Sequence, residues 1–459
     1  MKHKISDIIE KIEGNFDVKN IQTKRYGLNF EIYPWLKAKL FHKYIMGVDT
    51  LKNKSISVLW SQILSLFYGT WNLFIRKYEI WAFTNSIERI KISNKYHDKV
   101  FDGIEKQLSK KMLIIEFRLF KKYNYFKVAS KYVTSKSIFL LFEELYGLLF
   151  IRKIHIDNSE IINQIENELD CKIRVKSIVR KQLAQYRMMR FWLAILPNPK
   201  MVFLTVSYSN YGYITAFKEK GIKVIEFQHG VINKNHQAYY YKAKLNPIQF
   251  PDALCVFGTN EIDFLKMGTE FPHVNNYVVG RSIIDYYLNK ALENKKIKKV
   301  CVSLQDGPIS DDLIPFLLEF NSGMAETIEF VLVPRRTSKK IYLEKYNFPD
   351  NFSFSSQNIY ENIAESDAHI TAYSTTAVEA LSIGKRSILI DINGKAKEVF
   401  KETLGNNQFA FFTDSFVELE NHLSNSEIID KTTIAKSNDY NIKSDYSTNI
   451  SSFLTEICK

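Results

Sequence analysis

The sequence predicts an α/β protein with two domains, each built around a parallel β-sheet covered by helices. Three observations predict it. The chain has 459 residues, more than one hydrophobic core usually organises. From about residue 200, short runs rich in β-branched and aromatic residues alternate with helical stretches or loops, which is the rhythm of βαβ units. These runs are apolar almost throughout, which is typical of strands covered on both faces.

The first 195 residues show a mixed pattern of helical stretches around one strand candidate. Long helical periodicities cover residues 137–152 and 160–190, and one strand candidate, YEIWAFT, lies at 78–84. The uncharged segment 55–75, SISVLWSQILSLFYGTWNLFI, is long enough to span a bilayer. Its four serines and its Gln, Thr and Asn favour a buried or interfacial helix instead, and attachment to the inner membrane surface stays open.

The strand candidates of the remaining chain define the two domains. They cover residues 201–207, 222–228, 253–258, 277–280, 298–304, 328–334, 368–374 and 387–391. The polar, charged segment 283–299 lies between two series of strands and is the expected linker. This gives an N-terminal domain with helical additions over residues 1–290, and a C-terminal domain over 297–459 whose Ser-, Asn- and Lys-rich tail packs back on it.

Charge and cysteine usage limit the partners and the compartment. A net charge of +13 suits phosphorylated substrates, an anionic membrane or nucleic acid, although the composition of an AT-rich genome explains the lysines equally well. The sequence has no basic arm and no nucleic-acid-binding signature, so no nucleic-acid partner is expected. Four widely spaced cysteines, with no CxxC pair, fit a reducing cytosol, and the charged N-terminus is not a signal peptide.

Polar clusters follow four of the predicted strands at their carboxyl ends, where open α/β sheets bind their ligands. They are Gln228-His229-Gly230, Gln305-Asp306, Arg335-Arg336 and Ser374-Thr375-Thr376. His229 is the candidate general base, because an imidazole can take a proton from an attacking hydroxyl near neutral pH. Gly230 then lets the backbone turn. The alternative is a histidine with a structural role.

The segment 366–391 predicts a strand, a Ser/Thr turn, a helix, a glycine and a second strand. Ser374 or Thr375 would cap the helix, whose first N–H groups form a seat for an anion. Glu379, about one turn into the helix, could accept hydrogen bonds from ribose hydroxyls. The alternative is an ordinary capped helix with a glutamate on its surface. The guanidinium groups of Arg335 and Arg336 suit phosphate, and the alternative for them is a solvated pair at the end of a strand.

Three residues around the histidine are candidates for acceptor binding: Gln228, His236 and Tyr239. The tyrosine run that begins at Tyr239 could stack on a sugar, but its sequence favours covering the core. No third ligand with suitable spacing joins His229 and His236, so we expect no zinc site. The sequence also has no D-x-D motif, which argues against a metal-dependent reaction of that type.

The QHG run, VVGRSIID and ITAYSTTAVEALSIGKRSILID together resemble the GT-B glycosyltransferases of bacterial surface polysaccharides. Capsule Kdo- and sialic-acid-transferring enzymes and teichoic acid polymerases look most similar, over about residues 200–395. The last segment is also similar to the UDP-GlcNAc 2-epimerase pattern. Two departures are Tyr373-Ser374-Thr375-Thr376 in place of the epimerase Asp-Ser-Gly-Gly, and VLVPRRT where sialic-acid-transferring relatives have His-Pro.

The resemblance implies two Rossmann-like domains that face each other across a cleft, with the acceptor toward the N-terminal domain and the nucleotide donor in the C-terminal domain. His229 matches the QHG histidine, and Ser374, Thr375, Thr376 and Glu379 match the nucleotide-binding segment. Gln305, Asp306, Arg335 and Arg336 complete the expected donor site. Such enzymes commonly use no metal, and no cofactor beyond the nucleotide-sugar is expected.

These observations predict an inverting, metal-independent glycosyltransferase, or a polyol-phosphate transferase, that builds a capsule, lipopolysaccharide or teichoic-type glycan. The donor would be a nucleotide-activated sugar, a CMP-sugar among the candidates, and the acceptor a glycan or lipid-linked molecule. A cytoplasmic enzyme peripheral to the inner face of the plasma membrane fits this activity. The alternatives are a nucleotide-sugar epimerase and a non-catalytic protein that binds polyanions or membranes.

Overall fold

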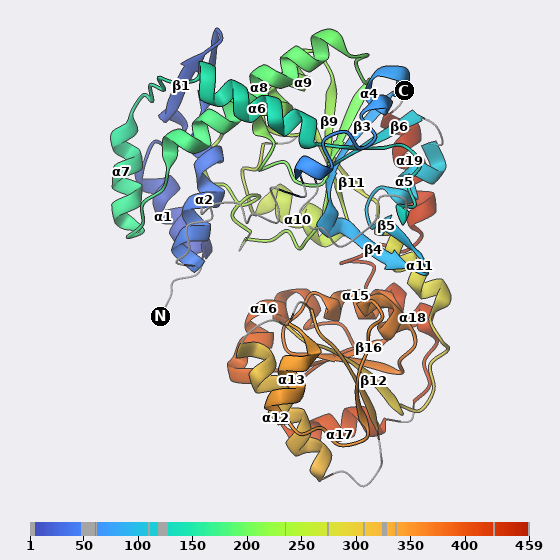
Figure 1. The fold of residues 1–459 in the computed structure, drawn as a ribbon. Helices are drawn as coiled ribbons and strands as arrows, with labels where there is room; N and C mark the ends of the chain where they lie inside the picture. The colour runs from blue at the N-terminus through green and yellow to red at the C-terminus, as the bar shows by residue number, and fades with distance from the viewer. Residues whose placement is uncertain are drawn as a thin grey trace. The chain divides into compact units, whose positions relative to one another are not determined.

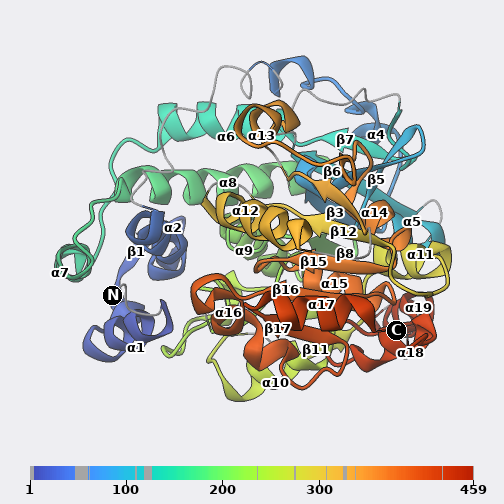
Figure 2. The same cartoon turned by 90° about the horizontal axis from the view of Figure 1, so that it is seen from below.

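The chain divides into two compact units. The computed structural model (Figures 1 and 2) describes residues 5–46, 60, 62–108, 111–117, 127–234, 236–272, 275–305, 308–323, 328–335, 337–425 and 427–457. The first unit comprises Met1–Val256 and Glu261–Tyr277. The second comprises Phe257–Asn260 and Val278–Lys459.

A seven-stranded sheet with the order β11-β10-β9-β8-β3-β6-β7 forms the centre of the first unit. Its strands are β3 (Ile80–Asn85), β6 (Met112–Phe117), β7 (Val133–Ser135), β8 (Met201–Leu204), β9 (Lys223–Phe227), β10 (Ala253–Val256) and β11 (Asn275–Val278). From β7 to β10, neighbouring strands run parallel. The sheet starts in the middle at β3, grows to one edge through β6 and β7, and then to the other from β8. The point between β3 and β8 is therefore its topological switch point.

Helices and two small hairpins surround this sheet. The helices are α1 (Ile5–Asn15), α2 (Tyr33–Met46), α4 (Trp71–Ile75), α5 (Asp102–Leu108), α6 (Ser137–Phe150), α7 (Ser159–Glu168), α8 (Val175–Ile195), α9 (Tyr211–Glu219) and α10 (Thr259–Met267). The hairpins are β1 (Gln22–Arg25) with β2 (Leu28–Glu31), and β4 (Arg89–Ile92) with β5 (Lys95–Asp98). The long helix α8 buries one face and packs against both α6 and α9 (Figure 1).

The second unit has a six-stranded sheet in the order β14-β13-β12-β15-β16-β17, and all its strand pairs are parallel. The strands are β12 (Lys299–Ser303), β13 (Glu329–Val333), β14 (Phe352–Phe354), β15 (Ala368–Thr371), β16 (Arg386–Ile390) and β17 (Ala410–Thr413). This is again a doubly wound order, with the switch point between β12 and β15. Apart from the half-buried Lys299, the central strands β12, β15 and β16 are buried, as their apolar sequences require.

Nine helices of the described chain belong to the second unit. They are α11 (Ser282–Lys290), α12 (Pro308–Ser322), α13 (Lys339–Lys345), α14 (Ile359–Ala364), α15 (Thr376–Ser382), α16 (Lys395–Leu404), α17 (Phe416–Ser424), α18 (Lys431–Ser437) and α19 (Tyr446–Ile457). The segment 283–299, which we expected to link the domains, contributes α11 and the start of β12 to this unit. It folds there because α11 is amphipathic and buries Ile283, Ile284 and Tyr287.

The predicted fold class, two Rossmann-like domains with parallel sheets and added helices, is confirmed. That the two sheets face each other across a cleft stays a prediction. The expectation of one strand in the first 195 residues is wrong, because β6 and β7 extend the sheet and two hairpins form there. The run 160–190 also divides, into α7 and α8.

Residues 55–59 and 61 of the uncharged segment 55–75 lie outside the described residues. The rest of the segment is helical at residues 60 and 62–64, forms turns at 65–70 and continues as the short helix α4, and several of its large side chains are exposed. No helix in the described part of the chain combines the length and the apolar character needed to cross a bilayer.

Candidate functional site

The histidine of the QHG run lies at the carboxyl edge of the first sheet, directly after β9. Gln228 continues the strand, because its backbone N–H donates to the carbonyl of Cys255 over 2.9 Å. The Gln228 side chain is buried, and its Nε2 donates to the Gly230 carbonyl at 2.9 Å and to Oε1 of Glu261 at 2.8 Å. The amide therefore holds the turn that places His229, half-buried, at the edge of the sheet. A role for Gln228 in acceptor binding stays a prediction.

Three aromatic residues surround His229 and form one cluster with it. The hydroxyl of Tyr208, on the loop after β8, lies 3.4 Å from Nε2 of His229. The Tyr208 ring is 6.1 Å from that of His229 and 5.9 Å from that of His236. Tyr239 packs edge-on against His236 at 4.8 Å. The structure thus brings His229, His236 and Tyr239 together, and it adds Tyr208, which the sequence analysis missed. Tyr239 is only 1% exposed and covers the core, whereas a role for His236 in acceptor binding stays a prediction.

A buried carboxylate supports this cluster from below. Glu226 lies within β9 and is fully buried. Its Oε1 accepts hydrogen bonds from the backbone N–H of Ser207 at 2.8 Å and from the Tyr239 hydroxyl at 2.7 Å. Burial raises the pKa of Glu226, and the two hydrogen bonds oppose that effect. Glu226 therefore ties the loop after β8 to the loop that carries His236. A carboxylate inside the apolar run IKVIEF was the signal for it in the sequence.

Burial sets the protonation of the groups beside His229. It lowers the pKa of His236 to about 4, and the neighbouring His229 adds to this effect, so His236 is neutral at pH 7. Burial, together with the charges of Glu226 and Glu88, raises the pKa of Tyr208 to about 12. Tyr208 therefore keeps its proton and can donate it toward Nε2 of His229. When it does, Nε2 is the unprotonated nitrogen, which is the form that a general base needs.

In the second unit, predicted donor-binding residues meet at the switch point between β12 and β15. Gln305 follows β12, and its Nε2 and Oε1 bond to the backbone carbonyl and N–H of Tyr373 at 3.4 and 3.3 Å. Ser374 comes next in the loop after β15. Ligands of open α/β sheets bind in the crevice at the switch point. Ser374, which the sequence analysis predicted to bind the donor, lies at this point. Asp306 lies outside the described residues.

The turn before α15 forms as expected in outline. The Oγ of Ser374 accepts from the N–H of Thr376 at 3.3 Å, and its carbonyl accepts from Ala377 at 3.0 Å. Ser374 is therefore the capping residue, while Thr375 makes no side-chain capping bond because its own backbone is already helical. Within the described chain, the buried Oγ1 of Thr376 has no hydrogen-bond partner. Gly384 follows the helix with a φ of +85°, which favours glycine.

Glu379 lies on α15 in a nearly buried ion pair. Its Oε1 accepts from Nη1 of Arg281, and from the Tyr360 hydroxyl at 3.0 Å. Oε2 has no hydrogen-bond partner among the described residues, so one oxygen is left for a ligand hydroxyl. The sequence analysis missed Arg281 and Tyr360, although Arg281 is part of the VVGRSIID segment that carries the resemblance.

The predicted arginine pair follows β13. Arg335 is exposed and forms no ion pair with any described residue. Arg336 lies outside the described residues. Across the described ranges, no group of three or more His, Cys, Asp or Glu side chains is placed to hold a metal ion. The exposed guanidinium of Arg335 makes this residue a candidate to neutralise a phosphate at this sheet edge.

No family model and no curated protein matches the sequence of this chain. Among solved structures, a UDP-N-acetylglucosamine 2-epimerase gives a TM-score of 0.50 at 10% identity, covering 83% of this chain and 97% of that one. CalG4, the calicheamicin glycosyltransferase, gives 0.48 at 11% identity over 84% and 100% of the two chains. The lipopolysaccharide outer core galactosyltransferase WaaB gives 0.44 at 12% identity over 82% and 99%. The similarity to the epimerase structure and the two doubly wound sheets together show that the chain has a GT-B-like fold.

Proposed function

We propose that the chain is an inverting, metal-independent glycosyltransferase that moves a sugar from a nucleotide-activated donor to a capsule or lipopolysaccharide-type glycan. The observation that carries the proposal is the cluster around His229, where a protonated tyrosine and a neutral histidine adjoin a half-buried imidazole at a sheet edge. The capped turn and the Glu379 oxygen at the second switch point support a nucleotide donor there. CMP-sugars remain among the candidate donors.

In this reaction the acceptor hydroxyl replaces the Tyr208 hydroxyl as the hydrogen-bond donor to Nε2 of His229, and Nε2 then takes the proton of the acceptor. The acceptor oxygen forms a bond to the anomeric carbon while the bond from that carbon to the phosphate oxygen breaks. The nucleotide leaves with the electron pair. Arg335, Arg336 and the N–H groups of the turn 374–376 offset its negative charge, and Oε2 of Glu379 accepts from a ribose hydroxyl. Gln305 and Asp306 complete the donor side and His236 the acceptor side, while the buried Tyr239 packs against His236 and supports it.

The proposal is tested with a panel of CMP-, CDP-, UDP- and GDP-sugars. We expect one nucleotide class to raise the melting temperature, and acceptor-dependent release of that nucleotide. His229→Ala should keep the thermal shift and lose release by a factor of about 100 or more, which is the usual contribution of a general base. His155→Ala, at an exposed histidine of the same unit, is the control and should match the wild type. Full activity of His229→Ala would refute the role of this residue.

A nucleotide-sugar epimerase is the second candidate, because the GT-B-like fold is also that of the UDP-N-acetylglucosamine 2-epimerase structure. An epimerase needs no acceptor. Conversion of the donor sugar in acceptor-free buffer, with the nucleotide still attached, would therefore favour it over transfer. For the transferase we place the enzyme at the cytoplasmic face of the membrane, where a lipid-linked acceptor would be reached.

A further inference from the structure

The first unit carries an apolar surface that its own fold leaves uncovered. The outer side of α6 presents Leu145, Leu148, Leu149 and Phe150, whose exposed fractions run from 47% to 63%. The opposite side of α6 packs on α8, as Figures 1 and 2 show. A continuous row of exposed leucines and a phenylalanine is unusual on a soluble helix and marks an interaction surface.

A second exposed apolar segment adjoins the beginning of α6. Phe67, Trp71 and Ile75 are 79%, 74% and 68% exposed. Hydrogen bonds fix the segment to β7 and to the first residue of α6, because Oγ of Ser65 lies 2.9 Å from Oγ of Ser137. The backbone N–H of Ser135 also donates to the Tyr68 carbonyl at 2.9 Å. We call these three residues and the four of α6 the apolar surface.

Cations border the apolar surface where each segment ends. Ile75 is followed by Arg76 and Lys77, and the last residues of α6 are followed by Arg152 and Lys153, all four of which are exposed. Alternation of exposed apolar residues with a basic border is typical of proteins that lie in the interface of a membrane. A second copy of the chain is opposed as occupant, since it would bring a further net charge of +13 against this basic border.

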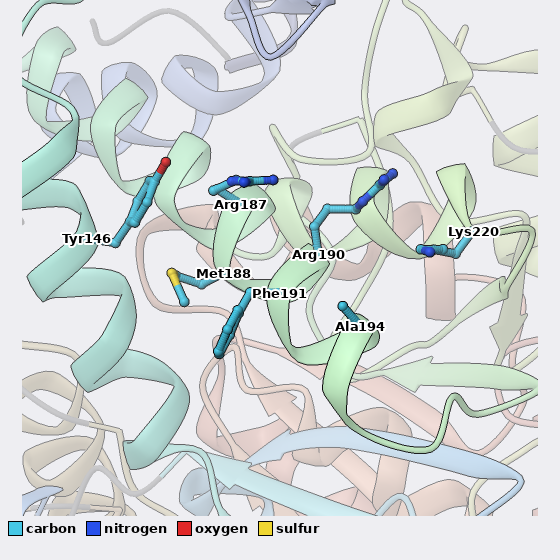
Figure 3. Close-up of a pocket in the computed structure, with 7 residues that line it drawn as sticks. All are labelled: Tyr146, Arg187, Met188, Arg190, Phe191, Ala194 and Lys220. Carbon is cyan, nitrogen blue, oxygen red and sulfur yellow. The ribbon is translucent and has the colours of Figure 1, made fainter.

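Both apolar and cationic side chains line a cavity of about 390 Å³ beside α6 (Figure 3). Met188 and Phe191 of α8, with Tyr146 of α6, give it an apolar wall. Arg187 and Lys220 line its other side, and neither forms an ion pair with a described residue. Arg190 also lines the cavity, but its Nη1 pairs with Glu219 at 2.8 Å. Two cations that pair with no described carboxylate, beside an apolar wall, suit a phosphate group attached to an acyl chain.

We propose that the apolar surface and this cavity dock the first unit on a bilayer that contains anionic phospholipid. The leucines and aromatic rings enter the boundary between headgroups and acyl chains. Arg187 and Lys220 receive a lipid phosphate, and the basic border contacts neighbouring headgroups. This deepens the proposed location at a membrane and depends on neither the donor nor the reaction.

The test is flotation of the full chain with vesicles of phosphatidylcholine alone or mixed with phosphatidylglycerol, without nucleotide-sugar. We expect binding to the mixed vesicles that weakens with salt. Leu148→Glu combined with Phe150→Glu should abolish it, whereas Met267→Glu, at an apolar residue that is 83% exposed elsewhere in the unit, should not. Arg187→Gln and Lys220→Gln should each weaken it about fivefold, the effect of removing one cation from an anionic surface.

Three results would overturn the proposal. The first is no binding of the wild type to either vesicle, and the second is equal loss in Met267→Glu. The third is a change of oligomeric state in the Leu148→Glu, Phe150→Glu variant, which would assign the surface to a second copy. The melting-temperature shift with the nucleotide donor should be the same in every variant, so failure here is distinguishable from failure of the proposed reaction.

Discussion

The hydroxyl of Tyr208 lies 3.4 Å from Nε2 of His229, although the two residues follow different strands of the first sheet. Parallel strands end at one edge, so the loops after β8 and β9 meet there. The buried Glu226 joins the first loop to the segment that carries Tyr239. The imidazole is therefore held by its neighbours rather than presented on a free loop, which is what a general base requires.

Tyr208→Phe removes the hydroxyl and leaves the ring. We expect kcat to fall by up to about tenfold with little change in KM, because one positioning hydrogen bond is worth about 1 kcal/mol. Steady-state kinetics of nucleotide release measure this. The control is Tyr346→Phe, at a tyrosine that bonds Asp311 in the second unit, and equal kinetics in both variants would contradict a positioning role.

Glu379→Ala leaves the guanidinium of Arg281 without its carboxylate in a nearly buried site. We expect the free energy of unfolding to fall by about 3–5 kcal/mol, the cost of an uncompensated buried charge. Glu398→Ala breaks an exposed pair with Lys395 and should cost less than about 1 kcal/mol. Urea unfolding measures both, and similar losses would show that the Arg281 pair is as weak as a surface pair.

Ser374→Ala removes the cap of α15. The loss of a capping oxygen costs about 1 kcal/mol of stability, and we expect KM for the donor to rise because the turn 374–376 is less well ordered. Thr375→Ala serves as the matched control for stability, since Thr375 makes no side-chain capping bond. A larger stability loss in Thr375→Ala than in Ser374→Ala would refute the assignment of the cap.

We expect the free energy of unfolding to depend on pH through His369. It lies fully buried in β15 between the hydroxyls of Ser303 and Ser387, at 2.7 and 3.0 Å, and burial lowers its pKa to about 3. Its unfolded pKa is near 6.5. The contribution of His369 to the free energy of unfolding is therefore fully present above pH 6.5. Between pH 6.5 and 3 the free energy of unfolding falls by about 1.4 kcal/mol per pH unit, because the unfolded state takes up the proton.

The variant His369→Gln keeps polar ends between the two serines but has no group that titrates. We expect its unfolding free energy to fall less steeply than that of the wild type in this pH window. Carboxylates contribute equally to both proteins, so the difference between the two curves isolates the histidine. Parallel curves from pH 6.5 to 3 would contradict the buried, neutral imidazole.

Much of the fold was predictable because the sheets are buried on both faces. Strands in such sheets are short apolar runs, and every run predicted after residue 200 corresponds to a strand. The carboxyl-end rule then placed His229 and Ser374 at sheet edges. Run length could not reveal β7, which has only three residues, and its pairing with β6 depends on the fold around it.

The sequence analysis missed Arg281 and Tyr208 because their contacts in the site depend on the folded chain. Arg281 and Glu379 pair across 98 positions of the chain, and no local pattern records such a contact. Tyr208 belongs to an aromatic-rich sequence in which no single tyrosine stands out. Its proximity to His229 follows from the parallel register of β8 and β9, which only the folded sheet defines.

The most direct measurement of the central claim is nucleotide release by the wild type and by His229→Ala at saturating donor, with and without acceptor. The account predicts release that requires the acceptor in the wild type, and its loss in the variant while the donor still raises the melting temperature. Release in the variant at the wild-type rate, or a sugar converted without any acceptor, would contradict it.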